Sequence, residues 1–114
     1  MKFWEYVLLQ ASNKASITIY DNVSMAFGSK IITVQLDIPN NPKQHLYKSV
    51  LIKRDVVICT NSVIFQGVQV GEGAVIGPGA IVVRDVPAHT LVLGNPARVV
   101  QTYNKELVSS YNTL

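Results

Sequence analysis

An apolar residue recurs at every sixth position in the second half of this chain, at Ile52, Ile58, Ile64, Val70, Ile76 and Val82. A helical period of 3.6 residues would drift out of phase with this spacing within two repeats, and strict strand alternation would require apolar partners at polar and glycine positions. Six residues suit a short strand followed by a turn. The repetition therefore predicts an all-β solenoid of flat-sided coils, which is the structure typical of hexapeptide repeats.

Smaller residues occupy the position four places after each of these lead residues. They are Val56, Ser62, Val68, Ala74 and Ala80. We expect both sets to point inward, with the smaller residues in the crowded corners of a narrow prism. Gly or Asn at 61, 67, 71, 73, 77 and 79 suits the turns, where positive φ favours these residues. Ile19, Met25 and Ile31 repeat the spacing earlier in the chain, and three repeats make about one triangular coil.

The non-repetitive stretches suggest one domain over 1–114 with five parts. These are an N-terminal cap at 1–14, a first coil at 15–34, a protruding loop at 35–49, main coils at 50–93, and a C-terminal motif with a short helix at 94–114. Tyr103, Leu107 and Tyr111 share one face of that expected helix. Because a solenoid leaves an unpaired coil at each end, we expect the terminal segments to cover the ends.

The composition of the 114 residues narrows the classes of partner. A chain that is 48% hydrophobic and 15% charged favours self-association, and a net charge of +3 is too mild for nucleic acid but suits a phosphorylated small ligand. The apolar stretches are shorter than the roughly 18 residues of a membrane span. The first ten residues make a poor secretory signal, so a cytoplasmic location is expected. The single cysteine, Cys59, has no neighbouring base and is interpreted as structural.

Two stretches resemble a known family. The run from Ile58 to Val100, especially VQVGEGAVIGPGAIVVRDVPAHTLVLGNPARVV, is similar to the C-terminal half of the left-handed β-helix acyltransferases, which include galactoside, maltose and xenobiotic O-acetyltransferases. The run SITIYDNVSMAFGSKIIT, from Ser16 to Thr33, resembles the coil before the active-site loop of the same family. The resemblance implies left-handed coils, a homotrimer, and acetyl-CoA as co-substrate in a groove between subunits. It also implies a small-molecule acceptor such as a sugar.

The resemblance also suggests cofactor-binding residues. The positions that match the family's cofactor contacts are Thr60, Gly77, Pro78, Gly79, Ala80, Val83, Arg84 and Arg98. Glycine backbone admits close approach of the pantetheine arm. Guanidinium groups suit the nucleotide phosphates because each donates paired hydrogen bonds.

The catalytic position departs from the family pattern. The family's general base is a His at the start of the protruding loop, and the matching position here holds Leu36. Without that base, acyl transfer would lose about 10²–10⁴-fold in rate. His45 and Asp37, within the expected loop, are the candidate substitutes. His89 is expected to be structural or exposed.

The sequence is compatible with three functions. The first is CoA-dependent transfer of an acetyl group to a hydroxyl or amine. The second is a catalytically inactive trimer that binds CoA or serves as a structural module. The third, a metal-dependent trimer like the carbonic-anhydrase-type hexapeptide proteins, requires three His ligands for each zinc, and the chain has two His, so no metal is expected. Family enzymes carry more coils before the residue that matches Ser16, so the acceptor pocket is expected to be truncated or rebuilt.

Overall fold

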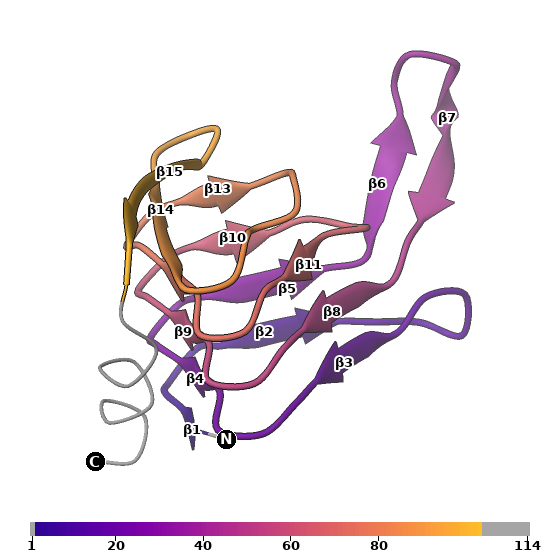
Figure 1. The fold of residues 1–114 in the computed structure, drawn as a ribbon. Coiled ribbons are helices and arrows are strands. Elements are labelled where there is room, and N and C mark those ends of the chain that lie inside the picture. Colours follow the sequence, from indigo (N-terminus) through magenta and orange to yellow (C-terminus); the bar gives the residue numbers. More distant parts are fainter. Residues whose placement is uncertain (1, 104–114) are drawn as a thin grey trace.

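Short parallel strands form the three sides of a β-helix in the computed structural model, which describes residues 2–103 (Figure 1). The first side contains β1 (Lys2–Phe3), β4 (Ser24–Met25), β9 (Val57–Ile58), β12 (Val75–Ile76), β14 (Thr90–Leu93) and the antiparallel β15 (Arg98–Thr102). The second side contains β2 (Leu8–Gln10), β5 (Lys30–Ile32), β10 (Val63–Ile64) and β13 (Ile81–Val82). The third side contains β3 (Ile17–Ile19), β8 (Val50–Ile52) and β11 (Gln69–Val70).

The register of the sheets shows the length of one coil. Val57 pairs with Val75, Val63 with Ile81, and Leu51 with Gln69, so stacked partners lie eighteen residues apart on all three sides. Eighteen residues are three hexapeptide repeats. The interpretation of three repeats as one coil is therefore confirmed.

The predicted lead residues form the core. All six, and all five of the smaller inward residues, expose 1% or less of their surface. Met25, Ile58 and Ile76 stack directly over one another through the pairing of β4, β9 and β12. Burying such aliphatic columns is the main source of stability in a fold with strands this short.

Two buried serine hydroxyl groups in the core each donate a hydrogen bond. Ser29 donates to the carbonyl of Ala26 at 2.7 Å, and Ser62 donates to the carbonyl of Cys59 at 2.8 Å. In both cases the acceptor lies three residues earlier, across the corner. The corner thus satisfies a buried polar group that would otherwise destabilise the core.

The corners follow the predicted spacing, with one refinement. Positive φ recurs every six residues, at Asp55, Asn61, Gly67, Gly73 and Gly79. Gly71 and Gly77 were also expected at turns, but their φ lies outside the left-handed region. A Cβ at Gly71 would lie 2.5 Å from the backbone nitrogen of Ala88. Glycine is needed there because the next coil stacks too closely for a side chain.

The two ends differ from the expectations. Residues 2–10 were expected outside the repeat, but β1 and β2 pair with β4 and β5 and form a further part of the coil. Residues 98–102 form β15, which pairs antiparallel with β14, and residues 2–103 contain no helix. Most of the helix expected near the C-terminus falls at 104–114, outside the described residues. In the described part, no helix has the length and apolarity to cross a membrane.

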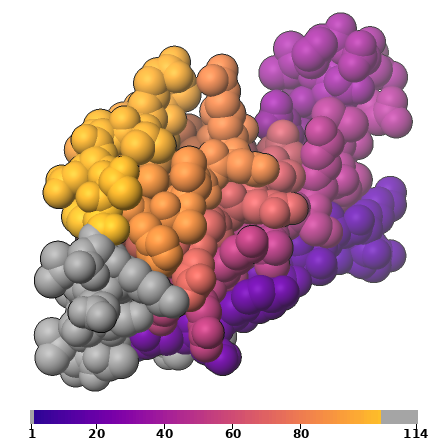
Figure 2. Space-filling view, viewed as in Figure 1, coloured from indigo at the N-terminus to yellow at the C-terminus, as the bar shows by residue number. Residues whose placement is uncertain are grey.

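The predicted protruding loop is a β-hairpin. Strands β6 (Val34–Asp37) and β7 (Asn41–Tyr47) pair antiparallel and leave the coil at the corner between the second and third sides. The hairpin extends away from the stack (Figure 1), and it stands clear of the orange and yellow C-terminal coils in the space-filling view (Figure 2).

The environment of Cys59 agrees with a structural role. The residue is partly buried at the corner after β9, and its backbone nitrogen donates to the carbonyl of Ile76 at 2.8 Å. Burial raises the pKa of the Cys59 thiol above its ordinary value. A reactive cysteine requires the opposite shift, because the thiolate is the nucleophile.

The aliphatic column gives a test of the core. We expect Ile58→Ala to lower the free energy of unfolding by about 2–5 kcal/mol and Ile58→Val by about 0.5–1.5 kcal/mol, because the larger deletion leaves a cavity between two coils. Denaturant unfolding monitored by circular dichroism measures both. Equal, small effects of the two substitutions would contradict the packing described here.

The raised pKa predicts slow modification of Cys59. We expect alkylation by iodoacetamide in the folded protein to be slow at pH 7 and to accelerate as the pH rises beyond the ordinary thiol range, where the thiolate forms. The same reaction in denaturant serves as the control for the unhindered thiol. Rapid alkylation of the folded protein at pH 7 would show instead that the thiol is activated.

Candidate functional site

Some of the predicted cofactor-binding residues lie on the corner between the first and second sides. Thr60, Pro78 and Gly79 are exposed there, and the backbone nitrogen of Gly79 donates to the carbonyl of Thr60 at 2.9 Å. Apart from Gly79 and its two chain neighbours, no atom of residues 2–103 lies within 4 Å of the place where a Gly79 Cβ would be. This corner therefore offers an open strip of backbone with one hydroxyl group beside it.

Two members of the set face inward at the same corner. The Ala80 side chain is fully buried in the core, and Gly77 is buried beneath the next coil, where a Cβ would lie 2.9 Å from the carbonyl oxygen of Val92. Their possible contribution to ligand binding is thus limited to backbone atoms.

The predicted basic residues meet at the C-terminal end of the stack. Arg84 and Arg98 are both exposed and line one hollow of about 360 Å³, which Asp85 and Ala97 also border. Val83, next to Arg84, exposes 49% of its surface. Two arginine residues 14 positions apart in sequence therefore border one hollow, although Arg84 follows β13 and Arg98 begins β15.

The Gly-Asn-Pro-Ala-Arg motif brings Arg98 to this place. The carbonyl of Gly94 accepts a hydrogen bond from Ile81 at 2.9 Å, and the nitrogen of Ala97 donates to the carbonyl of Ile81 at 2.8 Å. Both bonds fasten the turn onto β13. The motif thus folds back over the last coil and starts β15 beside the hollow.

The two groups of predicted residues lie on either side of one short strand. Residues 77–80 form the corner before β13, and Val83 and Arg84 follow it. A strand of this length separates its two ends by about 10 Å. An extended ligand is needed to contact both groups, and a compact one would contact only one of them.

The hairpin brings His45 next to the position expected for the catalytic base. Leu36 on β6 and His45 on β7 are direct partners in the antiparallel ladder. Side chains of such partners project from the same face with their Cβ atoms about 4.5–5.5 Å apart. His45 is exposed, and its ring centroid lies 6.2 Å from that of Tyr47. An imidazole is therefore present on this face of the hairpin, one strand away from Leu36.

Asp37 has a different environment. Its side chain is buried, and its Oδ1 accepts a hydrogen bond from Nδ2 of Asn40 at 3.1 Å. The ladder is irregular between Leu36 and Asp37, where the hairpin turns. The carboxylate is thus engaged in holding the turn.

His89 occupies a corner of the last complete coil. Its φ is 56°, and its ring covers Gly73 of the coil below. Its Nδ1 is buried and has no hydrogen-bond partner among residues 2–103. These contacts agree with the expected structural role.

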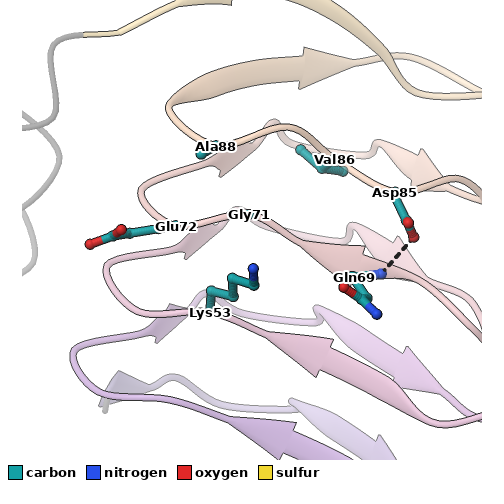
Figure 3. A pocket seen from close by; sticks show the side chains of 7 residues that line it. All are labelled: Lys53, Gln69, Gly71, Glu72, Asp85, Val86 and Ala88. Carbon is teal, nitrogen blue, oxygen red and sulfur yellow. Dashed lines mark hydrogen bonds between the residues drawn. The ribbon is translucent and has the colours of Figure 1, made fainter.

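A second hollow lies on the third side of the stack (Figure 3). It has a volume of about 360 Å³ and is bordered by Lys53, Glu72 and Asp85. Oδ1 of Asp85 accepts a hydrogen bond from the backbone nitrogen of Gln69 at 2.9 Å. None of the predicted cofactor or catalytic residues lines this hollow. In the described part of the chain, no group of three or more His, Cys, Asp or Glu side chains is arranged to hold a metal ion.

The structure also shows a set of contacts that the sequence did not reveal. Gln10 bonds to Thr33 at the start of the hairpin, and Ser16 bonds to Ser49 at its end. These partners are 23 and 33 residues apart. In each pair one partner, Gln10 or Ser49, lies outside the predicted coils, so no periodic signal identifies the contact.

Comparison with known proteins places this geometry in context. No family model matches the chain. The chain is 49% identical over 65 residues to 2,3,4,5-tetrahydropyridine-2,6-dicarboxylate N-acetyltransferase of Enterococcus faecalis, a match that covers 57% of this chain and 28% of that enzyme. The matched region therefore covers less than a third of this curated relative's length.

Solved structures show the same fold. AntD, an N-acyltransferase from Bacillus cereus crystallised with dTDP and 3-hydroxybutyryl-CoA, is similar with a TM-score of 0.85 and 21% identity, over 97% of this chain and 64% of AntD. Galactoside acetyltransferase in complex with coenzyme A is similar with a TM-score of 0.74 and 22% identity, over 88% of this chain and 60% of that one. The chain thus has the left-handed β-helix fold of the hexapeptide-repeat acetyltransferases, and it resembles an acetyltransferase in sequence over 57% of its length.

Proposed function

We propose that this chain binds a coenzyme A thioester and transfers its acyl group, most simply acetyl, to a hydroxyl or amine of a small molecule. The observation that carries the proposal is the hollow shared by Arg84 and Arg98, next to an open glycine corner on this fold. AntD and galactoside acetyltransferase, which have the same fold, were crystallised with CoA or a CoA thioester.

The charges of the hollow suit the nucleotide end of the cofactor. Each guanidinium donates paired hydrogen bonds to phosphate oxygens. Asp85 at the border would repel a phosphate, but one of its oxygens already accepts a hydrogen bond from Gln69. Two positive charges against one negative charge leave the border of the hollow net positive.

The open corner suits the pantetheine arm. The arm would leave the arginines, pass β13 and reach Thr60, which is an exposed residue. The missing Cβ at Gly79 leaves room for close approach. An extended ligand of this kind accounts for both groups of predicted residues.

We further propose that the chain assembles as a homotrimer and that the cofactor lies between subunits. Ile38 at the end of the hairpin exposes 66% of its surface, and Val83 beside Arg84 exposes 49%. Each of these apolar side chains would be removed from water if another subunit packed against it, which is favourable. Such packing would also enclose the cofactor arm.

His45 is the proposed general base. The acceptor nitrogen or oxygen attacks the thioester carbonyl while the imidazole takes its proton, and the C–S bond then breaks to release the CoA thiolate, which takes up the proton from the imidazolium. The direct pairing of His45 with Leu36 supports this assignment, because it keeps an imidazole close to the family position. Asp37 is the weaker candidate, since its carboxylate is buried in the turn.

The acceptor is proposed only as a class. The name of the Enterococcus faecalis relative specifies a dicarboxylate acceptor, and one AntD structure contains dTDP-4-amino-4,6-dideoxyglucose. Both suggest a polar small molecule with a reactive amine or hydroxyl.

The presence of Leu36 favours a second candidate function, a CoA-binding trimer without transfer activity. The two candidates share the cofactor groove and differ only in chemistry. Turnover with bound acetyl-CoA therefore distinguishes them.

The phosphate contact can be tested by calorimetric titration. We expect saturable binding of acetyl-CoA and about ten- to hundredfold weaker binding of dephospho-CoA, because charge-assisted hydrogen bonds are lost. Arg84→Ala and Arg98→Ala should reduce this discrimination, and Arg54→Ala, on a different corner, should preserve it. Absence of binding at millimolar cofactor would refute both candidate functions.

The base can be tested by steady-state kinetics on a panel of amine and hydroxyl acceptors. We expect His45→Ala to lower kcat by about 10²–10⁴-fold with little change in acetyl-CoA affinity, since a base acts on the acceptor proton. Leu36→His in the His45→Ala background should restore part of the rate, and Asp37→Asn is the comparison for the weaker candidate. Unchanged kcat in His45→Ala would contradict the assignment, and CoA binding without transfer in the wild type would favour the second candidate.

A further inference from the structure

The orientation of the hairpin that carries His45 depends on the contacts made where the hairpin joins the coil. It leaves the coil after Thr33 and returns before Val50, and the nitrogen of Lys48 donates to the carbonyl of Thr33 at 3.0 Å across its neck. A two-stranded hairpin has little stability of its own in water. Its direction is therefore set by the contacts made where it joins the coil.

Gln10 holds the outgoing end. Thr33 is fully buried, and its backbone nitrogen donates to Oε1 of Gln10 at 3.0 Å. The Thr33 hydroxyl donates to the backbone carbonyl of Gln10 at 2.9 Å. One residue at the end of β2 thus accepts both hydrogen bonds that Thr33 donates here.

Ser16 holds the returning end. Its backbone nitrogen donates to Oγ of Ser49 at 3.0 Å, and its carbonyl accepts from the nitrogen of Val50 at 3.0 Å. Both ends of the hairpin are therefore bonded to residues 10–16, which run from the end of β2 to the start of β3.

The same segment reaches the face of the hairpin on which His45 lies. A tight turn, closed by the bridge between Ser12 and Ala15, places Nζ of Lys14 4.9 Å from the centroid of the Tyr47 ring. That ring lies 6.2 Å from the His45 ring. A cation over an aromatic face is attractive, so Lys14 restrains the immediate neighbour of the imidazole.

We propose that Gln10, Lys14 and Ser16 form a hairpin clamp that fixes the position of His45, with Gln10 as a positioning residue that acts through Thr33. The catalytic part of this inference rests on the proposed function; the clamping of the hairpin does not. The clamp accounts for the hydrogen bonds that join Gln10 and Ser16 to the two ends of the hairpin.

Two readouts test the clamp separately. In Gln10→Ala, we expect hydrogen exchange of the hairpin amides at 41–47, measured by mass spectrometry, to rise about two- to tenfold, the factor for one lost hydrogen bond. Gln10→Glu keeps an acceptor oxygen and should restore most of the protection. Asn13→Ala, in the same turn but with no hydrogen bond to the hairpin within residues 2–103, is the matched control, and Ser49→Ala removes the other end of the clamp if Gln10→Ala folds poorly.

The kinetic readout tests the link to His45. We expect Gln10→Ala to lower kcat about ten- to hundredfold with unchanged acetyl-CoA affinity, because small misplacement of a reacting group has effects of this size. In the His45→Ala background, Gln10→Ala should cause no further fall. An equal fall in that background would overturn the positioning role, and unchanged hairpin exchange in Gln10→Ala and Ser49→Ala would overturn the clamp. If the wild type shows no transfer, the proposed function fails, and the exchange measurement alone decides on the clamp.

Discussion

The parallel hydrogen bonding between coils eighteen residues apart is the constraint on which the rest of this structure depends. The nitrogen of Val57 donates to the carbonyl of Ala74, and that of Cys59 donates to Ile76, so each strand is fixed above its predecessor. Because side chains alternate along a strand, a slip of one residue would turn the aliphatic column outward. An insertion can therefore leave the coil only at a corner, where the register of neighbouring strands is unaffected. The hairpin and the excursion at 11–14 both follow this rule.

The placement of the candidate functional groups follows from that constraint. The coil interior is occupied by packing, so exposed chemical groups lie at corners or beyond the stack. The arginines lie at the end of the coil, the hydroxyl of Thr60 lies on a corner, and the imidazole of His45 lies on the hairpin. The rigid stack sets their separations, which is the usual advantage of placing functional loops on a repetitive scaffold.

The sequence predicted the periodic part of the molecule well. Residues such as Ile64 and Ala80 could be assigned to the core because each repeat confirms the phase of the next one. The strands β1, β2 and β15 could not be found in this way, since they lie outside the period.

The bond between Gln10 and Thr33 joins residues without any shared pattern. The pairing of Leu36 with His45 depends on the register of an irregular hairpin, which composition does not determine. The corner glycines were recognised, but Gly71 serves close stacking of coils and not a left-handed turn.

The position of the arginine hollow has a thermodynamic consequence. In a stack whose units contact only their nearest neighbours, stability is close to a sum of unit and interface terms, and a terminal unit lacks one interface. Among the described residues, β13 is the last strand of its side, and the turn at Gly94 and Ala97 supplies the bonds that a further coil would otherwise make. A ligand held between Arg84 and Arg98 bridges that turn and the coil beneath it. Occupancy of the hollow would therefore act as a substitute for the missing neighbour and suppress fraying from this end of the stack.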